Sequence, residues 1–321
     1  MTDIAMIMAA AARISGHARL TPLLESDTLN EVAGRRVLVK AECLQRTGSF
    51  KFRGAWNALS CLPAGTGVLA YSSGNHAQGV ALSARLQGRV AVIVMPSDAP
   101  AVKIANTHGY GAEVVLYDRL SEDRAAIGAQ LAASRGLHLV KPFDDATVIA
   151  GQGTAGLEIA TQAAEMGVTA GVMLTCCGGG GLTSGIAVAL AACAPGFVVH
   201  PVEPAGFDDV AQSLALGRIV AHQGRATLCD AITTPAPGAL TFPLMQRLCG
   251  TGLTVTDAQA LAAMALAFTH LRIVLEPGGA VALAAALFRG DDLGDKAVIC
   301  TASGGNVDPA LFAQALRDHA N

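Results

Sequence analysis

The sequence predicts an α/β protein in which open, twisted and mostly parallel β-sheets are flanked by helices. Short apolar runs alternate along the 321 residues with helical segments that are rich in alanine. The apolar runs are continuous rather than interrupted by polar residues, as is typical of strands that a parallel sheet buries on both faces. Hydrophobic residues make up 52% of the chain and charged residues 15%, which also indicates extensive burial.

The expected elements follow these apolar runs in chain order. Strands are predicted at residues 37–42, 68–71, 90–95, 112–117, 171–175, 197–200 and 297–301. Helices are predicted at about residues 78–86, 124–134 and 182–192. Thr256 and Asp257 form a typical helix start, and that helix is expected to continue to about residue 274. Since no Pro/Ser-rich linker divides the chain, a second domain is expected to be inserted within the first.

Composition and charge argue against several classes of function. The net charge of −3, without any Lys/Arg run, offers no binding surface for nucleic acid or anionic lipid. Residues 1–12 lack the features of a signal peptide, and glycines interrupt the longest uncharged stretch, residues 166–202, so no membrane span is expected. The eight cysteines show neither a CxxC pair nor zinc-ligand spacing, which predicts a reduced, cytoplasmic protein.

Lys51 lies between two phenylalanines, Phe50 and Phe52. If the lysine is partly buried, desolvation lowers its pKa and frees the amine as a nucleophile. An amine of this kind forms a Schiff base with an aldehyde cofactor. Alternatively, the side chain extends along an apolar surface to reach solvent. The local sequence leaves both interpretations open.

Four consecutive glycines, Gly178 to Gly181, separate a predicted strand from a predicted helix. Glycine lets backbone N–H groups converge without interfering side chains, and the following helix adds its positive N-terminal end. The loop is therefore predicted to bind a phosphate, although its spacing matches neither a P-loop nor the dinucleotide fingerprint. The alternative is a flexible turn.

Three other loops also follow predicted strands. Residues 72–76 combine small polar side chains with a helix start, which suits a carboxylate; the alternative is a capped turn. Ser303 could donate a hydrogen bond to a ring nitrogen, although its segment alone is typical of a turn. Residues 203–209 contain three carboxylates, which suit either a hard cation or a solvated acidic turn. A lysine, a phosphate loop, a carboxylate loop and a ring-nitrogen partner are the parts of a pyridoxal-phosphate site.

Together these motifs resemble the serine/threonine dehydratase (threonine ammonia-lyase) and serine racemase family of fold-type II pyridoxal-phosphate enzymes. Residues 40–55 are close to the family's signature, and the resemblance extends from Thr21 to Asp308. It implies the tryptophan synthase β-like fold, with a large cofactor-binding domain formed by residues 1–66 and 145–321. A small α/β domain, residues 67–144, would be inserted in it, with the active site between the two domains.

The resemblance also implies a role for each motif residue. Lys51 would hold pyridoxal phosphate as a Schiff base and would act in catalysis together with Ser73. The cofactor would further contact Phe50, Asn75, Gly178, Gly179, Gly180, Gly181, Leu182, Glu276 and Ser303. The substrate would contact Ser72, Ser73, Asn75, His76 and Arg124. A divalent cation, Mg²⁺ or alternatively Ca²⁺ or Mn²⁺, would be bound by Glu203, the Phe207 carbonyl and Asp209.

The activity implied is dehydration of a β-hydroxy amino acid to a 2-oxo acid and ammonia, after Lys51 removes the Cα proton. The alternative is an amino-acid racemase, in which Ser73 would be the base on the opposite face of Cα. Because the dehydratases share that serine, the sequence does not separate the two. A cofactor-binding protein without catalysis is disfavoured because Lys51, Ser73 and Asn75 are intact, and a β-replacement enzyme because its Asn-Thr-Gly substrate loop is absent.

The side chain of the small-molecule substrate stays open among threonine, serine, 3-hydroxyaspartate and larger β-hydroxy amino acids. Arg53, His76 or Arg124 could bind a second carboxylate. The Pro-rich residues 233–238 depart from the Ser/Thr and Gly that relatives often have near the substrate side chain. The family also leads us to expect a homo-oligomer, either a dimer or a tetramer.

Overall fold

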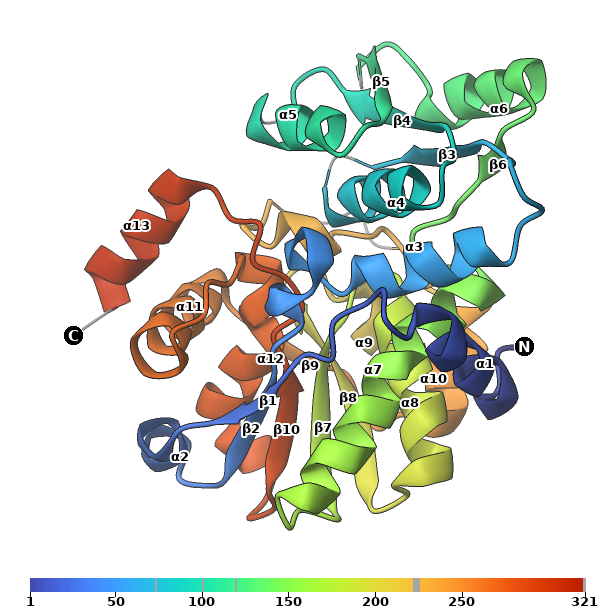
Figure 1. Ribbon diagram of the computed structural model, residues 1–321. Coiled ribbons are helices and arrows are strands. Elements are labelled where there is room, and N and C mark those ends of the chain that lie inside the picture. Colours follow the sequence, from blue (N-terminus) through green and yellow to red (C-terminus); the bar gives the residue numbers. More distant parts are fainter. Residues whose placement is uncertain (73, 100, 119, 222–225, 320–321) are drawn as a thin grey trace.

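The computed structural model describes residues 1–72, 74–99, 101–118, 120–221 and 226–319. Two β-sheets form the centres of two groups of elements (Figure 1). The larger sheet has the strand order β1-β2-β10-β7-β8-β9, and the smaller one has the order β5-β4-β3-β6. Neighbouring strands are parallel except for β1, which is antiparallel to β2. The predicted fold class, two mostly parallel sheets flanked by helices, is confirmed.

The strands and helices have the following bounds. The larger sheet contains β1 (Leu23–Glu25), β2 (Val37–Lys40), β7 (Gly171–Cys176), β8 (Phe197–Pro204), β9 (Leu253–Val255) and β10 (Val298–Thr301). The smaller sheet contains β3 (Val68–Tyr71), β4 (Ala91–Pro96), β5 (Glu113–Tyr117) and β6 (His138–Leu139). The helices are α1 (Ile4–Ile14), α2 (Asp27–Ala33), α3 (Lys51–Ser60), α4 (Asn75–Leu86), α5 (Ala101–Gly109), α6 (Arg124–Arg135), α7 (Ala146–Glu165), α8 (Gly181–Cys193), α9 (Asp209–Leu216), α10 (Thr241–Leu248), α11 (Asp257–Leu271), α12 (Pro277–Phe288) and α13 (Pro309–His319).

Helices cover both faces of the larger sheet, as its uninterrupted apolar strands require. Side chains alternate between the faces of each strand, so in β10 Val298 and Cys300 contact one apolar core and Ile299 contacts the other. Helices α2, α11 and α12 cover the first face, and α13 packs on α11. Helices α7 and α8 cover the second face, and α1 and α10 pack against them (Figure 1).

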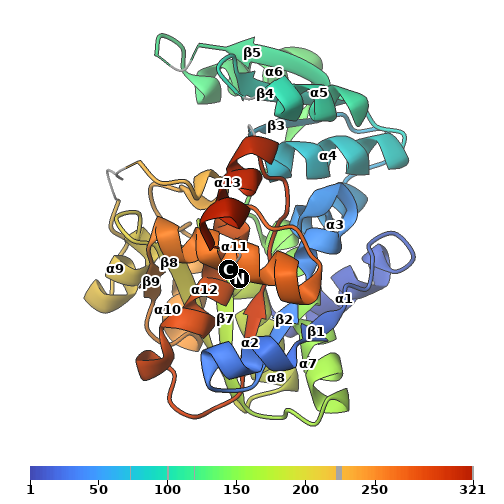
Figure 2. The same cartoon turned by 90° about the vertical axis from the view of Figure 1, so that its left-hand side faces the viewer.

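The smaller sheet is sandwiched in the same way between helices that lie near it in the chain. Helix α4 packs on one face against Val68, Ala70 and Ile93. Helix α6 covers the other face, where Ile127 and Leu131 contact the core formed by Leu69 and its neighbours. Figure 2 shows this group beside α3 and separate from the larger sheet. Every strand of the smaller sheet lies between residues 68 and 139.

Four predicted boundaries differ from the structure by two residues or more. The strand predicted at residues 197–200 continues to Pro204 as β8. The first predicted strand ends at Lys40 rather than at residue 42, because a short 3₁₀-helix, η1 (Glu42–Leu44), begins there. Helix α4 begins at Asn75 instead of near residue 78. Helix α11 has its N-cap at Thr256, as expected, but ends at Leu271 rather than near residue 274, because Arg272 adopts a left-handed conformation with φ of 59°.

None of the helices in the described part of the chain combines the length and the apolar character that crossing a membrane requires.

Candidate active site

A cavity of ≈ 320 Å³ lies where the carboxyl ends of β3, β7 and β10 meet, and we call it the Lys51 cavity. Ligand sites of open α/β sheets are found at this edge. Its lining includes most of the predicted cofactor and substrate residues, namely Phe50, Lys51, Ser72, Asn75, His76, Arg124, Gly178, Gly179, Gly180, Gly181, Leu182, Glu276 and Ser303. Ser73, the second predicted catalytic residue, lies outside the described residues.

Lys51 is the first residue of α3, and its side chain reaches the cavity. The Nζ atom donates a hydrogen bond to the Pro142 carbonyl at 2.8 Å and lies 5.1 Å from the centre of the Phe50 ring. Burial lowers the pKa of the Lys51 ammonium to about 8, although the Glu276 carboxylate favours the charged form. A useful fraction of the amine is therefore neutral and nucleophilic near neutral pH.

The glycine loop joins β7 to α8, and the structure leaves no room for side chains in it. A Cβ atom on Gly179 would collide with the Phe143 ring, and one on Gly180 would meet the Met245 Cε atom at 2.5 Å. Gly180 also has φ of 91°, which L side chains rarely adopt. Because only bare backbone lines this part of the cavity, ahead of the helix N-terminus, the loop fits a cofactor phosphate.

Asn75 belongs to a hydrogen-bonded chain that the sequence did not reveal in full. Its Nδ2 atom donates to Glu276 Oε1 at 2.5 Å, and its Oδ1 atom accepts from Asn306 Nδ2 at 2.6 Å. Asn306 also donates to the Thr47 carbonyl at 2.8 Å. The amide of Asn75 is thereby oriented with its NH₂ group toward Glu276. Asn306 follows Ser303 closely in the chain, but nothing in the local sequence indicates its contact with Asn75.

Burial in this cavity shifts the pKa values of both Glu276 and His76. Burial raises the pKa of the Glu276 carboxyl to about 7, although the hydrogen bond from Asn75 opposes the shift. Burial and the nearby Lys51 charge lower the pKa of His76 to about 3. The His76 Nε2 atom lies 2.9 Å from the Val140 carbonyl, which can only accept, so Nε2 carries the proton. A neutral imidazole supplies no cation for a second carboxylate.

Ser303 lies in the loop after β10 and is 4% exposed. Its carbonyl accepts a hydrogen bond from the Phe50 N–H at 3.1 Å, and its own N–H donates to the Gly279 carbonyl at 3.1 Å. These bonds join the loop to the residue before Lys51 and to α12. Whether the Ser303 hydroxyl faces a ring nitrogen stays a prediction.

Arg124 reaches the cavity from the first turn of α6, together with residues that sequence reasoning missed. Its guanidinium lies 5.5 Å from the centre of the Tyr71 ring, which also lines the cavity. Lys103 of α5 also lines the cavity and forms an ion pair with Asp230 at 2.7 Å. Among the described residues, Arg124 forms no ion pair with a carboxylate. No local sequence signal links these residues, because their contacts join distant segments.

Glu203 and Asp209 do not line the Lys51 cavity; they lie at the end of β8 and the start of α9. Both are 1% exposed. Glu203 accepts hydrogen bonds from the N–H groups of Val210 and Ala211, at 3.0 and 2.8 Å. Burial, then the Asp209 charge, raises the pKa of Glu203 well above its usual range. Two neighbouring buried carboxylates fit a hard cation, so this site stays a prediction.

The described residues contain no cluster of three or more His, Cys, Asp or Glu side chains that could bind a metal. The predicted set has only two such side chains, because its third ligand is the backbone carbonyl of Phe207.

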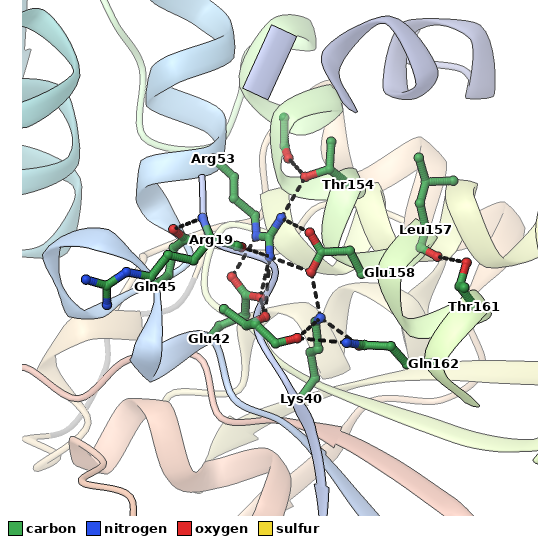
Figure 3. Close-up of polar contacts among 12 residues, drawn as sticks. Arg19, Lys40, Glu42, Gln45, Arg53, Thr154, Leu157, Glu158, Thr161 and Gln162 are labelled. Carbon is green, nitrogen blue, oxygen red and sulfur yellow. Dashed lines mark hydrogen bonds and ion pairs between the residues drawn. The ribbon is translucent and has the colours of Figure 1, made fainter. Parts of the chain in front are cut away.

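Arg53 does not line the cavity, so the prediction that it could bind a second substrate carboxylate is wrong. Its side chain is fully buried and forms ion pairs with Glu42 and Glu158 (Figure 3). Lys40, also fully buried, pairs with Glu158 at 2.6 Å. We call Lys40, Glu42, Arg53 and Glu158 the Arg53 network.

Comparison with known proteins agrees with this site. Residues 14–304 match the family described as Pyridoxal-phosphate dependent enzyme. The chain is 43% identical over 319 residues to an L-threo-3-hydroxyaspartate ammonia-lyase of Pseudomonas sp, covering 97% of both proteins. It is 39% identical over 313 residues to a serine racemase of Schizosaccharomyces pombe, covering 97% of this chain and 96% of the racemase. A crystal structure of a T.th. threonine deaminase superposes with a TM-score of 0.91 at 44% identity, covering 95% of this chain and 99% of the other.

These matches extend over nearly the whole chain and include the lysine, the glycine loop and the strand ends that form the cavity. The predicted cofactor, pyridoxal phosphate, and the predicted class, an ammonia-lyase that depends on it, are confirmed at this level. The chain belongs to the fold-type II pyridoxal-phosphate dependent enzymes.

Proposed function

We propose that this enzyme releases ammonia from L-threo-3-hydroxyaspartate, with oxaloacetate as the 2-oxo acid product. The similarity to the Pseudomonas ammonia-lyase supports this substrate. The observation that carries the proposal is Arg124, a cation that lines the Lys51 cavity and contacts an aromatic ring rather than a carboxylate in the described residues. Among the candidate substrates, serine and threonine have no charged side chain for Arg124 to bind.

A guanidinium can bind a carboxylate through two parallel hydrogen bonds, which lysine cannot do. The Tyr71 ring supports the guanidinium of Arg124 from one side, at 5.5 Å from the ring centre. Lys103 adds a second positive charge to the lining but is already paired with Asp230. Arg124 is therefore the cation that we assign to the side-chain carboxylate of the substrate.

The other predicted residues have complementary roles in this proposal. Pyridoxal phosphate, when bound through Lys51, supplies the electron sink that stabilises negative charge at the substrate Cα. The glycine loop would bind its phosphate, and Phe50 would pack against its ring. The N–H groups at the start of α4, together with Ser72, would bind the α-carboxylate of the substrate.

Lys51 would remove the Cα proton. Its pKa of about 8 places the amine near the range in which a base is effective at neutral pH. Loss of the proton and of the β-hydroxyl group, followed by hydrolysis, gives the 2-oxo acid and ammonia. Lys51→Ala should abolish both turnover and the absorbance of the bound cofactor.

Arg124→Met tests the substrate assignment. We expect kcat/KM for L-threo-3-hydroxyaspartate to fall about 10- to 100-fold, because the variant loses a hydrogen bond between charged groups. The kcat/KM for L-serine should change little. Arg135→Met is the matched control, because Arg135 lies at the other end of α6 and pairs with Glu113 on the surface. An equal loss for both substrates, or no loss for either, would contradict the assignment.

Amino-acid racemisation is the second candidate, supported by the similarity to the Schizosaccharomyces pombe serine racemase. It requires a second base, the role predicted for Ser73, on the opposite face of Cα. Chiral analysis of the amino acid that remains during turnover would detect it, and Ser73→Ala should suppress racemisation more strongly than ammonia release.

The proposal also includes the domain boundaries, the oligomeric state and the location of the protein. We place the inserted small domain at residues 67–144, which agrees with the strands of the smaller sheet all lying between 68 and 139. The family resemblance supports a homo-oligomer, dimer or tetramer, and the eight free cysteines support a cytoplasmic location. Limited proteolysis would test the domain boundaries, and sedimentation analysis would test the oligomeric state.

A further inference from the structure

The Arg53 network has no role in the proposed chemistry, although Lys40 and Arg53 lie in the same segment as Lys51. The Arg53 guanidinium pairs with both carboxylates (Figure 3). Its Nε and Nη2 atoms donate to the two Glu42 oxygens at 2.8 Å each. Its Nη1 and Nη2 atoms donate to the two Glu158 oxygens at 2.6 and 2.7 Å. With Lys40 as second cation, the two positive and two negative charges balance.

The network connects α3 to three other elements of the part of the molecule that contains the larger sheet. Lys40 lies on β2, Glu42 begins η1 and Glu158 lies on α7. Additional hydrogen bonds join Arg53 to Thr154 of α7 and to Thr21 in the segment before β1, at 3.2 and 3.3 Å. Three of the four side chains are fully buried and Glu158 is 17% exposed, and buried ion pairs are favourable only when several bonds fix their geometry. The direction of the Arg53 side chain is therefore closely determined.

Arg53 and Lys51 project from nearly opposite sides of the first turn of α3. Residues two apart in a helix differ by about 200° in direction, and accordingly Lys51 lines the cavity whereas Arg53 enters the network. The N-cap residue of α3, Phe50, makes no side-chain capping hydrogen bond. Arg53 thus supplies a side-chain anchor that the cap does not.

Close packing on both sides makes this turn sensitive to small movements. A Cβ atom on Gly79 of α4 would lie 3.2 Å from the Lys51 carbonyl, and one on Gly151 of α7 would lie 2.6 Å from the Arg53 carbonyl. The first turn of α3 therefore fits between two helices without spare room. If a substitution at Arg53 made this turn rotate, the Lys51 side chain would therefore move as well.

We propose that Arg53 is a positioning residue for Lys51: its two carboxylate pairs fix the first turn of α3, so that the amine is held in the cavity at the correct place. This inference rests on the proposed function only in taking Lys51 as the residue that holds the cofactor. A displacement of about 1 Å at a reacting group can lower a rate about 100-fold.

Arg53→Lys separates this role from a contribution of charge alone. Lysine keeps the positive charge but lacks the planar fork with which Arg53 gives two hydrogen bonds to each of the two carboxylates. Three measurements apply: thermal unfolding of the protein without cofactor, the pH titration of the bound-cofactor absorbance, and kcat and KM for the substrate. The titration reports the surroundings of the Lys51 nitrogen and does not depend on turnover.

In Arg53→Lys, assayed well below its melting temperature, we expect kcat to fall about 10- to 100-fold with KM changed by less than about threefold. The pH midpoint of the cofactor absorbance should also shift. Ile159→Ala is the matched control, because Ile159 is buried on α7 beside Glu158 and its truncation weakens the same helix without touching the network. This control should melt lower but keep its kcat and its titration.

The proposal is overturned if folded Arg53→Lys keeps the wild-type kcat and titration, or changes them only as much as Ile159→Ala does. If Arg53→Lys does not fold, Glu158→Gln takes its place, because it leaves the Glu42 pair intact; the same shift in titration is expected, and an unchanged titration refutes the idea. If the wild-type protein shows no cofactor absorbance that Lys51→Ala removes, the failure lies in the proposed function instead.

Discussion

Glu276→Gln should remove a pH-dependent decrease in the free energy of unfolding of the cofactor-free protein. Glu276 is 3% exposed, and burial raises the pKa of its carboxyl from the ordinary 4.5 to about 7. Glutamine has nearly the same shape, and its carbonyl oxygen can still accept the hydrogen bond that Asn75 donates at 2.5 Å. The substitution therefore removes the titrating group and leaves the contact.

The sign and size of the effect follow from linkage. Between pH 4.5 and 7 the unfolded chain has released the Glu276 proton while the folded chain still holds it, so the folded state loses stability as the pH rises. At about 1.4 kcal/mol for each pKa unit, the free energy of unfolding of the wild type falls by about 3 kcal/mol. This loss is complete somewhat above pH 7, and it is absent from the variant.

Urea unfolding of both cofactor-free proteins between pH 4.5 and 8 measures this difference. Other groups with shifted pKa values, such as His76 and Glu203, titrate in both proteins and largely cancel. We expect the variant to gain about 3 kcal/mol on the wild type as the pH rises through this range. Parallel stability curves for the two proteins would show that Glu276 is not shifted as the structure indicates.

Two other predictions concern the cofactor and metal sites. Gly179→Ala should raise the dissociation constant of pyridoxal phosphate about 10- to 100-fold, because the added methyl group collides with the Phe143 ring. A titration followed by the absorbance of the bound cofactor measures this constant. Unchanged affinity would refute the assignment of the loop as the phosphate site. Millimolar Mg²⁺ should raise the melting temperature of the wild type by a few degrees, by offsetting the buried charges of Glu203 and Asp209, and EDTA should reverse the gain. Glu203→Gln should abolish the response, and an equal shift in that variant would argue against a cation at this site.

Local sequence was sufficient for much of the fold. The strands at β3, β7 and β10 were predicted because uninterrupted apolar runs between turn residues form buried strands whatever their neighbours are. The helix start at Thr256 was predicted for a similar reason, since a cap depends on residues within one turn; the structure adds that Gln259 completes a capping box there. Helix α11 nevertheless ends before the predicted residue, where Arg272 adopts a left-handed conformation that the local sequence did not indicate.

The sequence by itself also indicated the chemistry, but only through its motifs taken together. Lys51 alone left two interpretations open, whereas a lysine, a glycine run, a carboxylate loop and a ring-nitrogen partner are the parts of a pyridoxal-phosphate site. Only the tertiary structure decided which charged side chains face the cavity. Arg53, two residues from Lys51, points away into a buried ion network, whereas Arg124 and Lys103 enter the cavity from other helices. The physical reason is that the direction of a side chain is set by its partners, and the partners of Arg53 on α7 lie about a hundred residues away in the chain.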